Sequence, residues 1–310
     1  MIKVVVTGAC GFIGSAITEK LISQGYFVEG IDNLDNNLYS KEVKEKRLSN
    51  LLNLNNFSFS NLDLATDNLD QSIEGSSYVI NEAALPGQVL SWEIFPKYVS
   101  ANILAVEKLL EKCLKYKVKK VVQASTSSVC GKFAVGNEAI PTNPISPYGI
   151  TKLAAENLYY ALGLNSDLNF AILRYFSVYG PGQRPDMAVH KFLKLIKSKG
   201  ELNITGDGTQ KRDLTFISDV VDATISSMKF EESGQIFNIS GGKQYSLNEI
   251  VNKCFDVVGA KANINYVKRP KGDQEETFGD NSKARLKLGF DPKVDLILGL
   301  QKQLSSMANE

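Results

Sequence analysis

Cysteine, histidine and tryptophan are scarce in this chain of 310 residues, which contains four, one and one of them respectively. The cysteines stand at positions 10, 113, 130 and 254, with neither the paired spacing of a disulfide framework nor the spacing of metal ligands. We therefore expect free thiols in a reducing compartment and no metal site. We expect the single histidine, His190, to be a structural or surface residue.

Long apolar runs and targeting patterns are also missing. No run reaches the ~18 residues that a membrane span requires, and no signal-peptide pattern precedes the first apolar segment. The net charge is only +1 and there is no long basic run, which argues against a nucleic-acid partner. Hydrophobic residues make up 43% of the chain and charged residues 22%, as in an ordinary globular protein. We expect it in the cytoplasm, away from membranes.

Glycine is present where it carries information, in a turn between a strand and a helix. Residues 2–6 form an apolar, β-branched run typical of a buried parallel strand, and residues 12–22 have helical periodicity. Gly8, Gly11 and Gly14 lie between and at the start of these segments. In this context the glycines allow a tight turn, a close approach of pyrophosphate to the backbone, and close helix packing. The pattern predicts a dinucleotide site at the helix N-terminus.

The second apolar strand ends at an acidic residue that indicates which dinucleotide is bound. Asp32 follows the strand at residues 27–31, where a carboxylate accepts hydrogen bonds from the adenosine ribose and repels a 2′-phosphate. No Arg or Lys lies between Asp32 and Ser40 to bind such a phosphate. The sequence therefore favours NAD over NADP.

Strand-like and helix-like segments alternate through the first 175 residues. The predicted strands are residues 2–6, 27–31, 57–62, 77–81, 118–124 and 169–173, and the predicted helices are residues 12–22, 41–54, 96–116 and 147–162. This alternation predicts βαβ units and an α/β fold with a Rossmann-type, doubly wound parallel sheet. In such sheets the ligand lies beyond the carboxyl ends of the strands.

Beyond residue 175 the alternation weakens, which predicts a second lobe. We expect an NAD-binding Rossmann domain over residues 1–175, completed by strands around 214–240, and a smaller, discontinuous α/β substrate lobe within 176–310. The strand-like segments at 216–217 and 235–239 are expected to return to the first sheet. A cleft between the lobes would hold a second ligand.

A tyrosine and a lysine four residues apart begin the helix predicted at 147–162. Tyr148 and Lys152 share one helix face, and Thr126 follows a predicted strand. A phenol has an unperturbed pKa of roughly 10, but a nearby ammonium and an oxidised nicotinamide would lower it. The sequence therefore predicts Tyr148 as a general base, with the Thr126 hydroxyl directed at the same substrate oxygen.

Four motifs together connect this chain with a known family. They are TGxxGFIG at residues 7–14, STSSV at 125–129, YxxxK at 148–152 and LRYF at 173–176. They resemble the extended short-chain dehydrogenase/reductase family and, within it, nucleotide-sugar 4-epimerases that act on UDP-glucose or UDP-glucuronate. The similarity runs from residue 2 to about residue 289. It implies tightly held NAD and a homodimer that pairs the helices at 96–116 and 147–162.

The resemblance also implies roles for individual residues. Tyr148 would be the base, Lys152 would orient both the tyrosine and the nicotinamide ribose, and Thr126 would be the hydroxyl partner. The cofactor contacts it implies are Gly8, Gly11, Phe12, Ile13, Gly14, Asp32, Asn33, Asp63, Leu64, Ala83, Ala84, Asn102, Ser125, Tyr148, Lys152 and Tyr175. The substrate contacts are Thr126, Ser127, Tyr148, Ser177, Arg184, Arg212, Arg269 and Asp273.

Arginines of the second half are expected at the nucleotide diphosphate, because a guanidinium meets phosphate oxygens bidentately. Arg212 lies in GDGTQKRD at 206–213, and RPKGD at 269–273 resembles the motif that supplies a second arginine and an aspartate. One extra residue in RPKGD leaves Arg269 and Lys271 as alternatives. For Arg184, contact with the sugar or phosphate and simple exposure in a loop both remain open.

Some family chemistries and some family positions do not match. Family dehydratases carry Thr-Asp-Glu where this chain has Thr-Ser-Ser at 126–128, and decarboxylases carry a glutamate at the last of these positions. The chain therefore lacks their acid/base group, and C4 epimerisation remains as the leading hypothesis. A 4-ketoreductase, a dehydratase without its usual acid, and a non-catalytic NAD-sensing protein are alternatives. Asn81-Glu82, Cys130 and Ser177 depart from the family pattern.

Overall fold

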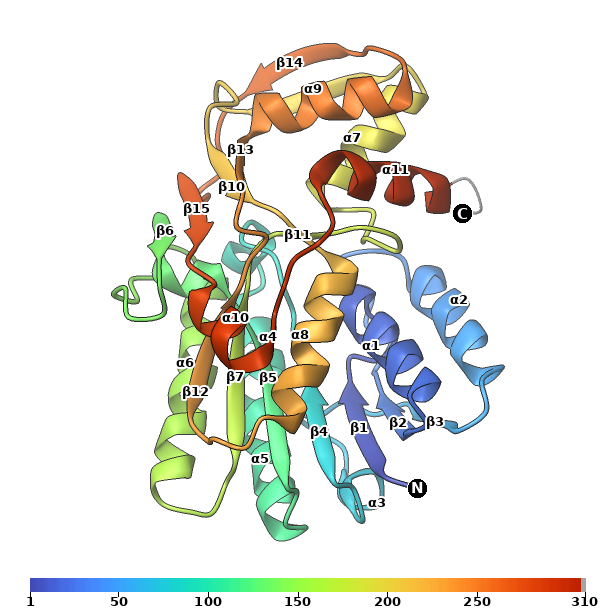
Figure 1. The fold of residues 1–310 in the computed structure, drawn as a ribbon, viewed down its shortest axis with the longest axis vertical. Helices are drawn as coiled ribbons and strands as arrows, with labels where there is room; N and C mark the ends of the chain where they lie inside the picture. The colour runs from blue at the N-terminus through green and yellow to red at the C-terminus, as the bar shows by residue number, and fades with distance from the viewer. Residues whose placement is uncertain (308–310) are drawn as a thin grey trace.

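A seven-stranded parallel sheet organises this computed structural model, which describes residues 1–307 (Figure 1). The strand order is β12-β7-β5-β4-β1-β2-β3. The strands are β1 (Lys3–Thr7), β2 (Phe27–Ile31), β3 (Phe57–Ser60), β4 (Tyr78–Asn81), β5 (Lys120–Thr126), β7 (Phe170–Tyr175) and β12 (Gln235–Ile239). The doubly wound Rossmann-type sheet predicted from the sequence is confirmed.

Helices cover both faces of this sheet, because successive residues of a strand point to opposite sides. Val4 and Val6 of β1 pack into one apolar core, together with α1 (Phe12–Ser23) and α8 (Ile217–Lys229). Val5 packs into a second core on the other face. The helices that contribute to this second core are α3 (Asp70–Ile73), α5 (Ala105–Lys115) and α6 (Pro147–Leu164). Helix α2 (Lys41–Leu52) lies beside α1 and β3.

The helix predicted at 96–116 is interrupted in the structure. Residues Phe95–Val99 form α4, Ser100–Leu104 adopt a π-helical turn (η2), and α5 follows. The π-turn was not visible in the sequence, because the apolar spacing continues through it. Within η2, Asn102 is completely buried, and its side chain bonds to the loop after β4 instead of facing solvent.

The two late strands expected in the first sheet separate. β12 pairs in parallel with β7 as expected, with Gln235 opposite Ala171. The prediction for residues 216–217 was wrong, because β11 (Thr215–Phe216) pairs instead with β8 (Val178–Tyr179) in a separate two-stranded sheet. Strands β8 and β11 have two residues each and lie in the connection between the large sheet and the upper elements. A segment so short has no sequence pattern that indicates which strand it pairs with.

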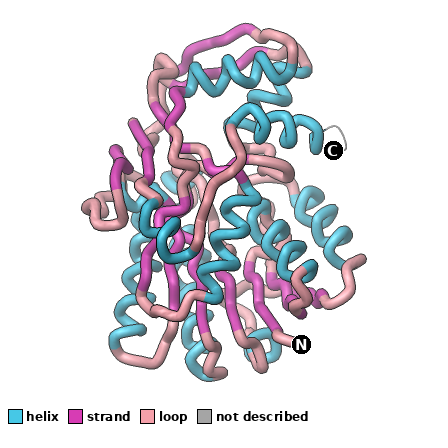
Figure 2. Tube along the Cα trace, in the orientation of Figure 1, coloured by secondary structure: helices cyan, strands magenta, loops and turns pink. Residues whose placement is uncertain are grey.

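A second group of elements lies above the carboxyl ends of the large sheet, and loops cross between the two parts (Figure 2). Its helices are α7 (Ala188–Lys197), α9 (Leu247–Val258) and α11 (Leu296–Ser306), and β9 (Glu201–Thr205) pairs with β14 (Asn263–Val267). A small sheet joins β13 (Gln244–Ser246), β10 (Lys211–Asp213), β15 (Glu276–Gly279) and β6 (Phe133–Gly136). Helix α10 (Ser282–Leu288) packs against β12 and α8. The short helices η1 (Leu90–Trp92) and η3 (Ser127–Cys130) follow β4 and β5.

A buried ion pair joins helix α6 to strand β7. Arg174 Nη2 lies 2.8 Å from Glu156 Oε2, and both side chains are almost fully buried. The Arg174 Nε–H donates to Glu156 Oε1, which also accepts from the Ser125 hydroxyl. Because each charge is paired and hydrogen-bonded, the desolvation penalty is offset only while both partners are present.

We predict that Glu156→Gln lowers the free energy of unfolding by about 3–5 kcal/mol, because it leaves the Arg174 guanidinium buried without a counter-charge. Equilibrium denaturation with urea measures the change. Lys287→Ala is the matched control, since it removes an ion pair with Glu232 that is largely exposed, and it should change the free energy by less than about 1 kcal/mol. Equal losses in the two variants would contradict the assigned role of the buried pair.

Candidate functional site

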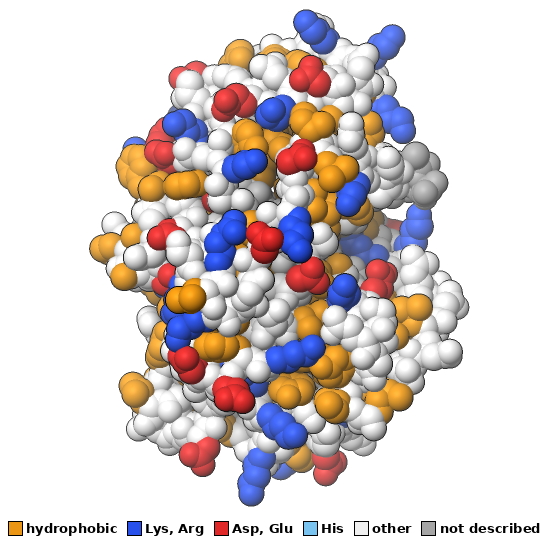
Figure 3. All heavy atoms as spheres, viewed as in Figure 1, with side chains coloured by type: hydrophobic (Ala, Val, Ile, Leu, Met, Phe, Trp, Pro, Cys, Tyr) orange, Lys and Arg blue, Asp and Glu red, His pale blue; other side chains and the backbone are white. Residues whose placement is uncertain are grey.

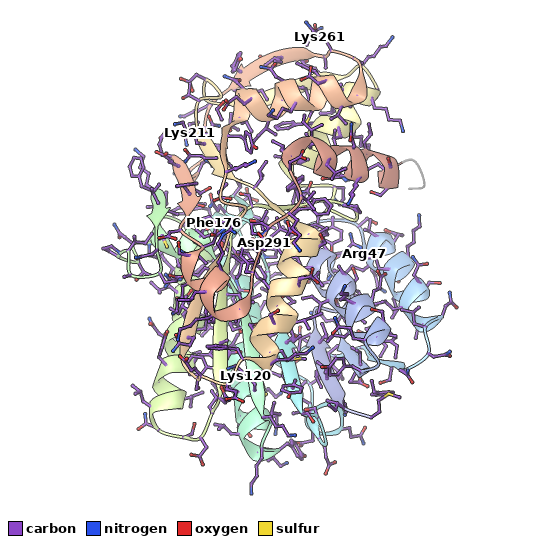
Figure 4. All side chains as sticks on the ribbon, viewed as in Figure 1. Arg47, Lys120, Phe176, Lys211, Lys261 and Asp291 are labelled. Carbon is purple, nitrogen blue, oxygen red and sulfur yellow. The ribbon has the colours of Figure 1, made fainter. Side chains whose placement is uncertain are left out.

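A cavity of about 840 Å³ lies at the carboxyl ends of the parallel strands, between the large sheet and the upper elements. Strands β1, β2, β4, β5 and β7 all end at its wall, as expected for an open parallel sheet. Figure 4 shows the polarity of the sheet, since Phe176 lies where β7 ends and Lys120 lies at the opposite end, where β5 begins. Functional side chains from distant parts of the sequence therefore meet at one edge.

The glycine turn after β1 forms a tightly packed part of the cavity wall. Gly8 has φ +65°, and a Cβ there would lie 2.8 Å from the backbone nitrogen of Ala83. A Cβ on Gly14 would lie 2.2 Å from the Gly8 carbonyl oxygen. Gly11 is the N-cap of α1 and offers no side chain to the first-turn amides, so these remain available to a phosphate. Together with the small residues Ala83 and Ala84, this cradle fits a dinucleotide.

Asp32 lies at the end of β2 and is held by three donors. Its carboxylate accepts from the backbone amides of Cys10 (3.1 Å) and Leu34 (2.8 Å). The Lys44 ammonium of α2 lies 3.2 Å from Asp32 Oδ1. No basic residue lies between Asp32 and Ser40 in the sequence, but the fold brings Lys44 of the next helix to the Asp32 carboxylate. Lys44 thus neutralises part of the charge that was expected to repel a 2′-phosphate.

Helix α2 is also tied to the loop after β8 and to the glycine turn. Arg47 donates to the Gly182 carbonyl oxygen at 2.6 Å and to the Cys10 carbonyl oxygen at 3.2 Å. The glycine turn and the loop after β8 are therefore held at a fixed separation. Nothing in the local sequence around Arg47 indicated this link, because its partners are defined only by the tertiary fold.

Of the other predicted cofactor residues, Asn33, Asp63 and Leu64 line the cavity, whereas Asn102 lies behind its wall. Asn33 donates to Asp63 at 2.9 Å, and both line the cavity with Leu64. Asn102 does not line it. Its amide bonds to both backbone groups of Leu85 and donates to the Thr151 hydroxyl of α6, so it positions the loop after β4 against that helix.

Tyr148, Lys152 and Thr126 lie on the same cavity wall. Burial raises the pKa of Tyr148, while a hydrogen bond with Thr126 and the charge of Arg184 act in the opposite direction. Burial also lowers the pKa of Lys152 to about 8, although Glu82 and Glu156 oppose the shift. The expected acidification of the phenol is thus not present in the protein alone. It requires an additional positive charge, which an oxidised nicotinamide carries.

Two arginines and an aspartate form a charged cluster at the other end of the cavity. Arg212 Nη2 lies 2.7 Å from Asp273 Oδ1, and Arg269 bonds to Asp273 and to Glu275. Arg212 and Asp273 line the cavity, whereas Arg269 lies behind them. Of the two alternatives in the RPKGD motif, Arg269 is the one that pairs with Asp273.

The loop between β8 and α7 contributes Arg184 to the cavity wall. Its guanidinium makes a two-pronged contact with Asp186, at 2.9 and 2.8 Å. The Arg184 side chain is only 15% exposed, so the interpretation as a solvent-exposed loop arginine is wrong, and contact with the sugar or phosphate stays a prediction. Ser177 and Ser127 also line the cavity.

Several cavity residues were not among the predicted site residues. They include Tyr39, Lys44, Glu82, Gln88, Lys97, Ser128, Met187 and Gln274. Gln88 donates to the Ser128 hydroxyl at 3.0 Å, and Gln274 donates to the Gly131 carbonyl oxygen at 2.8 Å. In the sequence, Glu82 stands out only as a departure from the family pattern. That departure is the signal that could have indicated a role for it in the cavity.

The four cysteines are buried free thiols, and Cys130 lies behind Thr126 within η3. Burial raises the pKa of Cys130, which keeps it a neutral thiol rather than a nucleophile. His190 is buried on α7. Within residues 1–307, no cluster of three or more His, Cys, Asp or Glu could hold a metal ion, and no helix combines the length and apolarity that crossing a bilayer requires.

Comparison with known protein families matches residues 4–240 to the NAD dependent epimerase/dehydratase family. The chain belongs to this family. One relative is an uncharacterized UDP-glucose epimerase of Bacillus subtilis. It is 38% identical, and the alignment covers 99% of this chain and 98% of the relative's chain. A UDP-glucuronate 4-epimerase of Thermodesulfobacterium geofontis is also 38% identical, over 97% and 94% of the two chains.

A solved structure of a related enzyme agrees with this structure over almost the whole chain. It is the UDP-glucuronic acid 4-epimerase of Bacillus cereus in complex with UDP-glucuronic acid and NAD, which is 35% identical. The superposition covers 99% of each chain with a TM-score of 0.96. The upper elements as well as the sheet are therefore shared with that enzyme.

Proposed function

We propose that this chain is an NAD-dependent epimerase that inverts C4 of a UDP-sugar, either UDP-glucose/galactose or UDP-glucuronate/galacturonate, through transient oxidation to a 4-keto sugar. One observation carries the proposal. A single cavity contains the glycine cradle at one end, the Arg212–Asp273 cluster at the other, and Tyr148, Lys152 and Thr126 on its wall. This arrangement provides a dinucleotide site, an anion site and a general base together.

The side chains supply the steps other than the oxidation itself. NAD, when bound, supplies the reversible two-electron oxidation of C4. Tyr148 takes the proton of the sugar 4-hydroxyl and later returns it, and Lys152 orients Tyr148 and the nicotinamide ribose. The Thr126 hydroxyl bonds to the same sugar oxygen. Ser127 and Ser128 provide no acid for α-proton removal, which favours epimerisation over dehydration.

The nucleotide diphosphate belongs at the charged cluster of the upper elements. Arg212 already forms a charge-assisted bond to Asp273, and a diphosphate also offers pairs of anionic oxygens that a guanidinium can meet bidentately. We assign the substrate lobe to residues 176–310 and the NAD domain to residues 1–175 with β12 added. The alternatives are a 4-ketoreductase or a dehydratase on the same scaffold. A non-catalytic NAD sensor would have no use for Tyr148 and Lys152.

We further propose a homodimer in the cytoplasm, without a nucleic-acid partner. Helices α4 and α6 pack side by side with η2. Large apolar side chains of this region are half exposed, namely Trp92, Leu104 and Ile150. Such a patch is typical of an interface. On the face in Figure 3, basic and acidic side chains are interspersed and do not form one basic patch.

We predict that Tyr148→Phe retains NAD but loses about 10²–10⁴-fold in turnover, because the sugar hydroxyl has no proton acceptor. The assay follows C4 inversion by NMR with UDP-glucose, UDP-glucuronate and UDP-N-acetylglucosamine. Mass spectrometry of the copurified ligand checks that the variant still holds NAD. Failure of the NAD-loaded wild-type protein to invert any of the three sugars would refute the proposal, and near-normal turnover of the variant would refute the role of Tyr148.

We predict that Arg212→Met raises KM for the UDP-sugar about 10- to 100-fold, because charge-assisted bonds to the diphosphate are lost. NAD content and kcat should change little, since Arg212 lies far from the glycine cradle along the cavity. Arg285→Met is the matched control, because Arg285 pairs with Asp291 at an exposed position outside the cavity. An unchanged KM in Arg212→Met would place the diphosphate elsewhere.

We predict that Leu104→Glu combined with Ile150→Lys converts a wild-type dimer into monomers, because charges would then be buried at the interface. Sedimentation equilibrium measures the mass. Leu286→Glu, on α10, is the control for a surface apolar residue outside this region and should leave the dimer intact. A monomeric wild-type protein would exclude the proposed dimer.

A further inference from the structure

Glu82 is an acidic side chain on the wall of the cavity that the mechanism above does not use. It follows β4 directly, and its backbone lies against the glycine turn, because a Cβ on Gly8 would approach the Glu82 carbonyl carbon at 2.9 Å. Its side chain reaches across to the end of β7. Glu82 therefore lies between the cradle that fits the dinucleotide and the wall that holds Tyr148 and Lys152.

The partners of Glu82 form a short chain of hydroxyl groups. The Tyr175 hydroxyl lies 2.7 Å from Glu82 Oε1 and 2.8 Å from Thr224 Oγ1, and the Thr224 hydroxyl lies 2.8 Å from the Val220 carbonyl oxygen. Three hydrogen bonds need three protons, and the two hydroxyls supply only two. All three bonds form together only when the Glu82 carboxyl carries the third proton. In that arrangement Glu82 is the donor, whereas an ionised Glu82 accepts from Tyr175, so the bond from Tyr175 by itself favours the carboxylate and the count of hydrogen bonds favours the neutral carboxyl.

The charges around Glu82 act in the opposite direction. Lys152 on α6 stabilises the carboxylate. The other titratable groups that face Glu82 are Tyr148 on α6 and Tyr175 on β7, both neutral phenols whose pKa values burial raises. The second acid near Lys152, Glu156, is already paired with Arg174. Burial raises the pKa of Glu82 to about 7, so a modest change in local charge decides its ionisation.

We propose that Glu82 is a cofactor-tuning residue, whose carboxylate lowers the reduction potential of the bound NAD and so keeps the cofactor oxidised between catalytic cycles. This inference rests on the proposed function. The oxidised nicotinamide carries a positive charge that the reduced ring lacks, so an anion in the same cavity wall stabilises the oxidised form selectively. An epimerase that loses its keto sugar is left with reduced cofactor and is inactive. A lower potential makes that state less populated.

The pH dependence follows from the raised pKa. Above about pH 7 Glu82 is ionised and stabilises oxidised NAD, and this effect is lost as the pH falls through about 7. Lys152, with a pKa of about 8, also titrates in this range, so the wild-type profile alone does not isolate Glu82. The difference in reduction potential between wild type and Glu82→Gln isolates the contribution of Glu82, because Lys152 is present in both proteins.

The experiment is a redox titration of the NAD-loaded holoenzyme, followed by the near-ultraviolet absorbance of the reduced nicotinamide. At about pH 8 we expect Glu82→Gln to shift the oxidised-to-reduced equilibrium about tenfold toward the reduced form, which raises the potential by ~30 mV. At about pH 6 the two proteins should agree within about twofold. Glu93→Gln, an exposed acid outside the cavity wall, is the control and should match wild type at both pH values.

Thermal unfolding distinguishes an ionised Glu82 from a residue with a purely structural role, because replacing a structural residue would lower the melting temperature. Because a buried carboxylate with a raised pKa destabilises the fold once it ionises, Glu82→Gln should melt higher than wild type at about pH 8. Glu82→Leu serves as a second variant with the same expected shift in potential.

The outcomes separate the inference from the proposed function. Equal potentials in wild type, Glu82→Gln and Glu82→Leu, with epimerase activity present in the wild type, would overturn the role of Glu82 alone. Failure of the wild-type chain to bind NAD in either form would overturn both.

Discussion

The contact between the glycine turn and the loop after β4 is the constraint on which the site depends. The Gly14 position leaves no space for a side chain, because a Cβ would lie 2.2 Å from the Gly8 carbonyl oxygen. Gly8 in turn lies against the backbone of Ala83. This packing brings the start of α1, the end of β1 and the end of β4 together within van der Waals distance. A dinucleotide cradle and the backbone of Glu82 are therefore parts of one rigid unit.

Burial sets the electrostatics of this unit. It raises the pKa of Tyr148 and of Glu82 and lowers that of Lys152, so each group is shifted toward its neutral form. The cavity in the protein alone is thus poorly suited to a phenolate. A positively charged cofactor would reverse the balance for both acidic groups at once. The ionisation of Tyr148 and of Glu82 is in this sense coupled to the charge of a bound cofactor.

The ion pair of the charged cluster in the cavity differs from the ion pair within the scaffold. Glu156 and Arg174 are almost fully buried and join α6 to β7, so they fix the helix that carries Tyr148 and Lys152. Arg212 and Asp273 are partly exposed within the cavity, where a competing anion can reach them. The first pair is a structural element, whereas the second offers a guanidinium that can exchange its partner.

The sequence alone predicted the architecture from local patterns, and with the family resemblance it predicted many of the residues that line the cavity. Alternating apolar segments specify a parallel sheet, and the carboxyl ends of its strands must share one edge, which brings Asp32, Thr126 and Tyr175 together. Helical spacing placed Tyr148 beside Lys152. Only the tertiary structure decided which side chains modify these groups: Lys44 reaches Asp32, Asn102 supports a loop, and Glu82 meets Tyr175. Such contacts join residues that are 12 to 93 positions apart, and no local pattern encodes them.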